Sequence, residues 1–276
     1  MSQKTVISSV RSFKEDDPME NLTGKITIVT GVSYSKGMGA ATCLSLAKAG
    51  ADIFFTHWSP FDEAEGRLEE AFPSKLCEKL NGFGVRSDHM QLDLSLEESP
   101  NKLLNTVHNK LGTASILVNN ATYEAPTNFR TLTPETLDIH YQVNNRGTLL
   151  LSVEFAKRYE QQFQNKKDGR IINLVSKGPD PNNIAYIATK GMTIAATEPL
   201  SVALAPIGIT VNSIDPGPTD IGWMNEEIKS NLLPLFPSGR LGRPEDAAKL
   251  ITFLASDDSY WITGQTIRSE GGFLGK

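Results

Sequence analysis

The chain has 276 residues, of which 39% are hydrophobic and 21% are charged, a composition that fits one large globular domain with a substantial core. Its formal net charge of −5 gives no electrostatic case for nucleic acid or an anionic membrane surface as a partner. The two cysteines are too few for a disulfide framework, and the four scattered histidines match no metal-ligand motif. We expect a cytoplasmic protein with free thiols and no metal.

Residues 1–23 are polar and of mixed charge, and they lack the apolar core of a secretory signal. We expect them to form an N-terminal arm ahead of a single domain at 24–276. From there on, short apolar runs alternate with amphipathic stretches. Strands are expected at 26–30, 52–57, 89–93, 115–119, 170–175, 209–214 and 264–268. Helices are expected at 40–49, 62–80, 100–110, 134–164, 185–206 and from about residue 244.

Apolar strands that alternate with helices indicate a parallel sheet covered on both faces. The predicted fold class is α/β, a single doubly wound sheet of seven parallel strands with helices on both faces (a Rossmann fold). Ligands of such sheets bind beyond the carboxyl ends of the strands. The apolar segment 220–240 is predicted to be either a lid over a hydrophobic substrate or an ordinary packed helix.

The turn that follows the first strand is rich in glycine and opens the first helix. Glycines there let the backbone approach a pyrophosphate, and the helix N-terminus supplies free N–H groups and the positive end of a dipole. We therefore predict that this turn binds a dinucleotide. The residues assigned to it are Gly31, Ser33, Lys36, Gly37, Met38 and Gly39.

The end of the second strand bears on which nicotinamide cofactor is used. An acid there would bind the ribose 2′-hydroxyl of NAD, but the strand ends in 56–59 with no acid before Asp62. Lys36, helped by His57 or Ser59, could meet a 2′-phosphate. We therefore favour NADP(H) over NAD(H). The alternative is that Lys36 is a solvated loop charge and either cofactor is accepted.

Tyr186 and Lys190 lie four residues apart at the start of a predicted buried helix, so their side chains share one face. A free phenol has a pKa of about 10, and a nearby ammonium group lowers that pKa towards neutrality. The pair is a candidate general acid/base. Its significance comes from the surrounding motifs, because the spacing alone occurs by chance in many helices.

Taken in order, these motifs resemble the short-chain dehydrogenase/reductase family, of the kind that includes 3-oxoacyl-acyl-carrier-protein reductases. The resemblance runs from about Leu22 to Phe273. The glycine turn and the Tyr186/Lys190 pair are two of its marks. The others are Asp93-Leu94, Asn119-Asn120-Ala121, Asn144, Ser176, Pro216-Gly217, Ile262-Thr263-Gly264-Gln265 and Glu270-Gly271-Gly272.

The resemblance implies hydride transfer between a nicotinamide cofactor and a carbonyl compound or secondary alcohol, with a 3-oxoacyl thioester as one candidate substrate. Ser176 would stabilise the carbonyl oxygen and Tyr186 would give it a proton. Lys190 would lower the pKa of the tyrosine and hold the nicotinamide ribose. Asn144 would bind a water that links Lys190 to solvent.

The same resemblance implies further cofactor contacts and an assembly. Asp93 would meet the adenine, and the expected assembly is a homotetramer packed through the helices at 134–164 and 185–206. The remaining expected cofactor residues are Leu94, Asn120, Pro216, Gly217 and Thr219.

The sequence also departs from the family pattern around the cofactor. The turn from Gly31 to Gly37 is longer than in the usual reductases and is similar to that of the enoyl-acyl-carrier-protein reductase branch. Thr122 stands where glycine is usual. Ile221 stands in place of a threonine, so we expect Thr219 to reach the nicotinamide amide instead.

A further departure lies at the expected substrate mouth. The connection from Ser176 to Tyr186 is shorter than usual and contains two prolines, which could move Ser176 out of position. Two alternatives to a carbonyl reductase follow. A non-catalytic dinucleotide sensor is disfavoured because the residues of the proton relay are all retained. An enoyl reductase is disfavoured because that branch spaces its tyrosine and lysine further apart.

Overall fold

Strands and helices alternate along the part of the chain that the computed structural model describes, residues 21–164 and 166–275. The strands are β1 (Ile26–Val29), β2 (Asp52–His57), β3 (Ser87–Gln91), β4 (Ile116–Asn119), β5 (Gly169–Leu174), β6 (Ile209–Asp215) and β7 (Thr266–Arg268). The α-helices are α1 (Met38–Lys48), α2 (Ser59–Ala64), α3 (Phe72–Asn81), α4 (Ser99–Lys110), α5 (Pro134–Tyr141), α6 (Thr148–Gln162), α7 (Ile184–Leu204), α8 (Glu226–Leu232) and α9 (Pro244–Ala255). A π-helical turn, η1 (Gln142–Gly147), joins α5 to α6.

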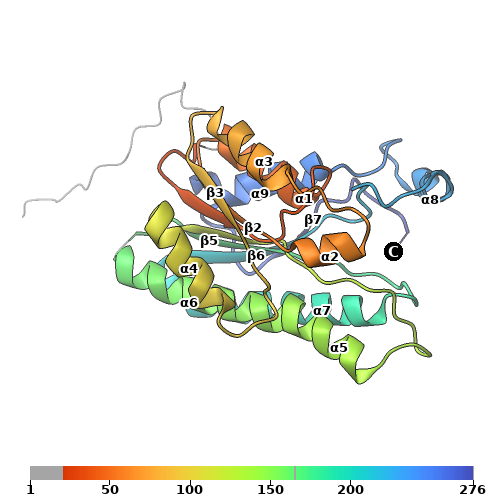
Figure 1. The fold of residues 1–276 in the computed structure, drawn as a ribbon. Helices are drawn as coiled ribbons and strands as arrows, with labels where there is room; N and C mark the ends of the chain where they lie inside the picture. The colour runs from red at the N-terminus through yellow and green to blue at the C-terminus, as the bar shows by residue number, and fades with distance from the viewer. Residues whose placement is uncertain (1–20, 165, 276) are drawn as a thin grey trace, which may run out of the picture.

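The seven strands form one sheet in the order β3-β2-β1-β4-β5-β6-β7, and every neighbouring pair is parallel. The chain winds outward from β1 in one direction and from β4 in the other, which places helices on both faces. In Figure 1, α1, α3 and α9 lie on one face, and α4, α6 and α7 lie on the other. The predicted doubly wound α/β fold is therefore confirmed.

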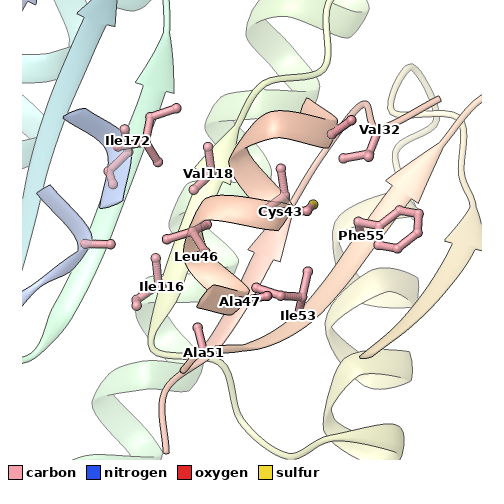
Figure 2. Close-up of a cluster of buried hydrophobic side chains, with 14 of the residues drawn as sticks. Val32, Cys43, Leu46, Ala47, Ala51, Ile53, Phe55, Ile116, Val118 and Ile172 are labelled. Atoms are coloured by element: carbon pink, nitrogen blue, oxygen red, sulfur yellow. The ribbon is translucent and has the colours of Figure 1, made fainter. Parts of the chain in front are cut away.

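Two hydrophobic cores, one on each face, hold the helices to the sheet. Figure 2 shows the first, in which Leu46 of α1 lies beside Val118 of β4 and Ala47 of α1 lies beside Ile53 of β2. The second contains Leu103 of α4 and Phe155 of α6. Because both faces are covered, the central strands are apolar along nearly their whole length, which is the pattern that made them recognisable.

One predicted helix is wrong in its extent. The segment 62–80 forms two helices, α2 and α3, rather than one. Gly66 adopts a φ of +66°, a left-handed conformation that ends α2. Pro73 then lies in the first turn of α3, where its missing N–H costs nothing. The residues between the two helices are free to fold back towards the end of β2.

The predicted helix at 134–164 is interrupted rather than continuous. Residues 142–147 wind as the π-turn η1 between α5 and α6, and α6 ends at Gln162. Single π-turns inside helices change the direction in which side chains point and often occur at functional sites. Here the turn carries Asn144, whose side chain is buried.

The fold begins before the predicted boundary at residue 24. Leu22 is fully buried, and its backbone N–H donates to the Ala49 carbonyl oxygen at 2.8 Å. Residues 1–20 of the predicted arm lie outside the described residues. Cys43 is buried and Cys77 is half-buried, both as free thiols. Within the described ranges, none of the helices combines the length and the apolar character that a membrane crossing requires.

Candidate active site

Tyr186 and Lys190 meet at the carboxyl edge of the sheet, on the first turns of α7. The Lys190 Nζ lies 5.6 Å from the centre of the Tyr186 ring and donates to the Leu174 carbonyl oxygen at 2.8 Å. Leu174 is the last residue of β5, so this bond fixes the lysine against the strand end that precedes Ser176. The structure thus brings the three predicted residues to one place.

The short connection does not separate Ser176 from Tyr186. The Ser176 side chain lies close enough to Tyr186 to act on it, and its effect is to lower the pKa of the phenol. Burial has the larger effect and raises that pKa above its ordinary value, and the charges of Glu124 and Asp215 raise it further. Burial therefore dominates the pKa of Tyr186 in this structure, and the predicted lowering of that pKa by Lys190 stays a prediction.

Burial lowers the pKa of Lys190, because it disfavours the charged ammonium form. Its side chain is 5% exposed, and burial lowers its pKa from 10.5 to about 8, with Glu124 acting in the other direction. At neutral pH the ammonium form prevails, and it supplies a donor in a site where few other groups reach.

This lowered pKa predicts how stability depends on pH. Between pH 8 and 10 the unfolded chain binds the Lys190 proton and the folded chain does not, so the free energy of unfolding rises with pH through this group. We expect Lys190→Met to be the more stable protein at pH 7, with its advantage over wild type shrinking by about 2 kcal/mol by pH 10. Denaturant unfolding at both pH values measures the change, and a constant advantage would contradict a lowered pKa.

Asn144 is held by the segment that follows β4. Its Oδ1 accepts from the Tyr123 N–H at 2.7 Å and from the Thr122 hydroxyl at 3.1 Å, and its Nδ2 donates to the Tyr123 carbonyl oxygen at 2.9 Å. The same Nδ2 donates to the Thr189 hydroxyl at 3.0 Å. The threonine that replaces the usual glycine therefore becomes part of this network. Asn144 joins the end of β4 to the residue before Lys190.

The glycine turn has the close packing that a dinucleotide-binding turn needs. Gly31 adopts a φ of +71°, and a Cβ there would lie 2.5 Å from the Ala121 Cα. A Cβ on Gly39 would lie 2.9 Å from both the Gly31 carbonyl oxygen and the Asn120 Nδ2. Among the described residues, no side chain caps α1 at Gly37 and no acid lies in its first turn. These residues fit a pyrophosphate group at the helix N-terminus.

The remaining residues of the turn lie close by. Met38 is the first residue of α1 and is half-buried. The Ser33 hydroxyl accepts from the Trp58 N–H at 3.4 Å, which ties the turn to the end of β2. Asn120 closes the turn from β4, since its Nδ2 donates to the carbonyl oxygens of Thr30 and Gly31 at 2.9 and 2.8 Å.

The other predicted cofactor residues follow β3 and β6. Asp93 is half-buried, and its Oδ1 accepts from the Ser95 N–H at 2.8 Å, while Leu94 is buried. Gly217 adopts a φ of +61° after Pro216. The Thr219 hydroxyl donates to the carbonyl oxygens of Gly217 at 3.2 Å and Pro216 at 3.4 Å, so it is engaged within its own turn.

Two charged residues follow β2: Asp62 on α2, whose place as the first acid after the strand was evident from the sequence, and Arg67, which sequence reasoning missed. Asp62 is 2% exposed; its Oδ1 accepts from the Arg67 Nε at 3.1 Å and its Oδ2 has no partner among the described residues. The Arg67 guanidinium lies 5.0 Å from the centre of the Tyr34 ring, above the glycine turn. The break between α2 and α3 places Arg67 here, and a continuous helix over 62–80 hid it.

His57 and Lys36 occupy different surroundings. The His57 Nε2 lies 3.1 Å from the His89 Nδ1, and burial lowers the pKa of His57 to about 4, with His89 adding to the effect. The imidazole is therefore neutral at pH 7. Lys36 lies against Gly222, and its charge helps to lower the pKa of Asp220. The structure thus leaves His57 unable to supply the positive charge for a 2′-phosphate.

The segment 220–240 is largely exposed, and two buried side chains hold it to the body of the molecule. Met224 and Phe236 are buried, whereas Trp223 is 54% exposed and its Nε1 donates to the Thr219 carbonyl oxygen at 3.0 Å. The short helix α8 projects from the body of the molecule in Figure 1. A cavity of about 490 Å³ separates this segment from the glycine turn. Its lining includes Ser35, Lys36, Gly37, Asp220, Gly222 and Lys229.

Comparison with known proteins identifies the family. The family described as enoyl-(acyl carrier protein) reductase matches residues 31–274, which is most of the chain. The chain is 45% identical over 259 residues to the uncharacterized oxidoreductase YjdA of Bacillus subtilis (strain 168), covering 93% of this chain and 99% of the relative. The chain belongs to the short-chain dehydrogenase/reductase family. It is accordingly an oxidoreductase of a family that binds nicotinamide dinucleotides.

Two further relatives of the family bear on its chemistry. The chain is 32% identical over 259 residues to the 3-oxoacyl-[acyl-carrier-protein] reductase FabG of Aquifex aeolicus (strain VF5), covering 92% of this chain and 98% of the relative. A blue fluorescent protein from a metagenomic library, solved in complex with NADPH, is 28% identical with a TM-score of 0.80, over 92% of this chain and 99% of that one. Both likenesses span the fold and the predicted site together.

Two acidic residues at the site were also missed. Glu124 follows β4 and Asp215 ends β6, and both act on Tyr186. Asp215 directly follows the predicted strand at 209–214, so a search for charged residues at strand ends would have found it, because the carboxyl ends of parallel strands meet at one edge. Glu124 lies further along the chain from the predicted strand at 115–119.

Proposed function

We propose that this protein reduces carbonyl compounds, or oxidises the corresponding secondary alcohols, with NADP(H). The observation that carries the proposal is the meeting of Ser176, Tyr186 and Lys190 at the carboxyl edge of the sheet, next to the glycine turn. A dinucleotide sensor would need the turn alone. The buried phenol and ammonium groups are costly to keep in a site that does no proton transfer.

Each residue has a role that follows from its surroundings. The bound cofactor supplies or accepts the hydride. The Ser176 hydroxyl, which lies beside Tyr186, donates a hydrogen bond to the carbonyl oxygen. The protonated Tyr186 gives that oxygen its proton. Lys190 stabilises the phenolate that remains and binds the nicotinamide ribose, while Asn144 positions the backbone of Tyr123 at the mouth.

The proposal is tested with the purified chain, NADPH and a neutral ketone. Loss of the NADPH absorbance that depends on the ketone is the expected result. NADPH binding without turnover of any carbonyl compound would favour the sensor, and reduction of an enoyl thioester alone would favour the enoyl reductase. The description of the matching family supports the enoyl reductase alternative. The similarity to the relative FabG makes 3-oxoacyl thioesters the first substrates to try.

We assign the choice of cofactor to Arg67 together with Lys36. Asp62 is the acid that would favour NAD, but Arg67 engages one of its oxygens and adds a cation beside the turn. We expect Arg67→Gln to weaken NADPH binding about tenfold and NADH binding hardly at all, because only NADPH carries the 2′-phosphate.

Fluorescence titration with both nucleotides measures this difference, and Lys75→Ala, which removes an exposed charge on α3, is the control. Equal losses of affinity for NADPH and NADH would mean that Arg67 stabilises the glycine turn and does not recognise the 2′-phosphate. Tighter binding of NADH by wild type would overturn the preference for NADP(H).

We also propose a homotetramer built through the α5–α7 face. Large apolar side chains are exposed along this face, where a second copy would cover them. Sedimentation as a monomer at micromolar concentration would contradict the assembly. The exposed residues are Leu137, Tyr141, Leu150, Val153, Met192 and Val202.

A further inference from the structure

Glu124 is an exposed carboxylate that its neighbours hold at the mouth of the proposed site. The backbone on one side of it is fixed by Asn144, which bonds both the N–H and the carbonyl of Tyr123. On the other side the Ala125 N–H donates to the His140 Nε2 at 3.3 Å. Its own Oε1 accepts from the Asn183 Nδ2 at 2.7 Å. The carboxylate is therefore positioned by contacts from three elements.

Asn183 connects Glu124 to the reacting groups. It is the residue before α7, three positions ahead of Tyr186, and it forms a parallel bridge with Thr127. The Ile184 N–H also donates to the Thr127 carbonyl oxygen at 3.0 Å. These bonds clamp the segment after β4 to the start of the helix that carries Tyr186 and Lys190. Glu124 consequently keeps its place relative to the phenol.

The charge of Glu124 reaches the whole reaction centre. It acts on both Tyr186 and Lys190, and on Tyr34 of the glycine turn. A second carboxylate, Asp215, also acts on Tyr186, and the charges of Arg268 and Lys177 offset part of its effect. A substrate carbonyl that approaches the phenol therefore comes within reach of the Glu124 charge.

We propose that Glu124 selects substrates by charge, favouring carbonyl compounds that are neutral or positively charged beside the carbonyl over oxo acids with a carboxylate there. The inference rests on the proposed carbonyl reduction at Tyr186. It favours a thioester or an ester, in which the neighbouring carboxyl group is masked, over the corresponding free acid. Two unit charges several ångströms apart in a partly exposed site change binding by about tenfold.

The test compares three methyl ketones with NADPH as the reductant: acetoacetate, its ethyl ester, and a ketone with a dimethylammonium group in place of the ester. Wild type is expected to show higher kcat/KM for the ester and the ammonium ketone than for the acid. In Glu124→Gln the preference for the ester over the acid should fall about tenfold. Glu124→Asp, which keeps the charge, should retain most of the preference.

Glu160→Gln is the matched control, because it removes an exposed carboxylate of α6 and should leave the ratio of the three rates as in wild type. Added salt should reduce the preference for the ester over the acid more in wild type than in Glu124→Gln, because salt screens the Glu124 charge. A purely structural role of Glu124 would not produce this difference. An unchanged ratio in Glu124→Gln, or a wild-type preference for the acid, would overturn the inference. Turnover of none of the three ketones would count against the proposed function itself.

Discussion

Replacing Tyr186 with Phe should lower carbonyl turnover by about 10³-fold, the size expected when a general acid is removed. The phenol is the group that gives its proton to the substrate oxygen, and burial keeps it protonated at neutral pH. The ring is retained in Phe, so the packing around α7 and the glycine turn should persist. NADPH affinity is therefore expected to stay within about threefold of wild type, which is under 1 kcal/mol.

Single-turnover kinetics and fluorescence titration on the same preparation separate the two effects. Tyr260→Phe is the control, since that tyrosine follows α9 and is exposed. If Tyr186→Phe reduced ketones at the wild-type rate, the proton would have to come from another group and the mechanism would be wrong. If NADPH binding were lost as well, Tyr186 would be shown to hold the cofactor rather than only to donate the proton.

The second large effect is expected at Gly31. An alanine there must adopt a left-handed conformation and bring its Cβ to 2.5 Å from the Ala121 Cα. Both penalties fall on backbone, so they cannot be relieved by a change of rotamer. We expect Gly31→Ala to lose about 3 kcal/mol of unfolding free energy. We also expect its NADPH affinity to fall at least about tenfold, because the turn must shift away from the pyrophosphate.

Gly178→Ala provides the comparison, because a Cβ at that glycine meets nothing within 4 Å. Its unfolding free energy and NADPH affinity should match those of wild type. Denaturant unfolding and nucleotide titration measure the two quantities for both variants. The prediction would be contradicted if Gly31→Ala matched wild type in stability and in NADPH affinity. The turn would then have space for a Cβ and would not contact the cofactor closely.

Much of the fold was predictable because a buried parallel sheet leaves a simple signal. The runs Ile116-Leu117-Val118 of β4 and Ile171-Ile172 of β5 are covered on both faces, so each appears as an uninterrupted hydrophobic stretch. The errors fell where helices are interrupted. Gly66 ends α2 through its left-handed backbone, and η1 inserts a π-turn in an otherwise regular pattern. Periodicity across each region stays helical on average, which concealed both breaks.

The candidate site was predictable to the extent that it depends on local sequence. The four-residue spacing of Tyr186 and Lys190 fixes their shared face, and the glycine turn directly follows a strand. Interactions between distant segments could not be predicted. Arg67 reaches Tyr34 only because α2 and α3 are separate, and Glu124 meets Asn183 only because β4 and β5 are neighbours. The raised pKa of Tyr186 likewise depends on three-dimensional burial.

The hydrogen bonds of Asn144 hold one side of the proposed active site rigidly and leave another side free to vary. One amide bonds Thr122, Tyr123 and Thr189, so the β4 end, the π-turn and the catalytic helix behave as a single rigid block. The segment 220–240 has no share in those bonds. Insertions or substitutions on that side can reshape the space for the substrate without disturbing the proton donor. New substrate preferences in relatives of this chain should therefore arise there first.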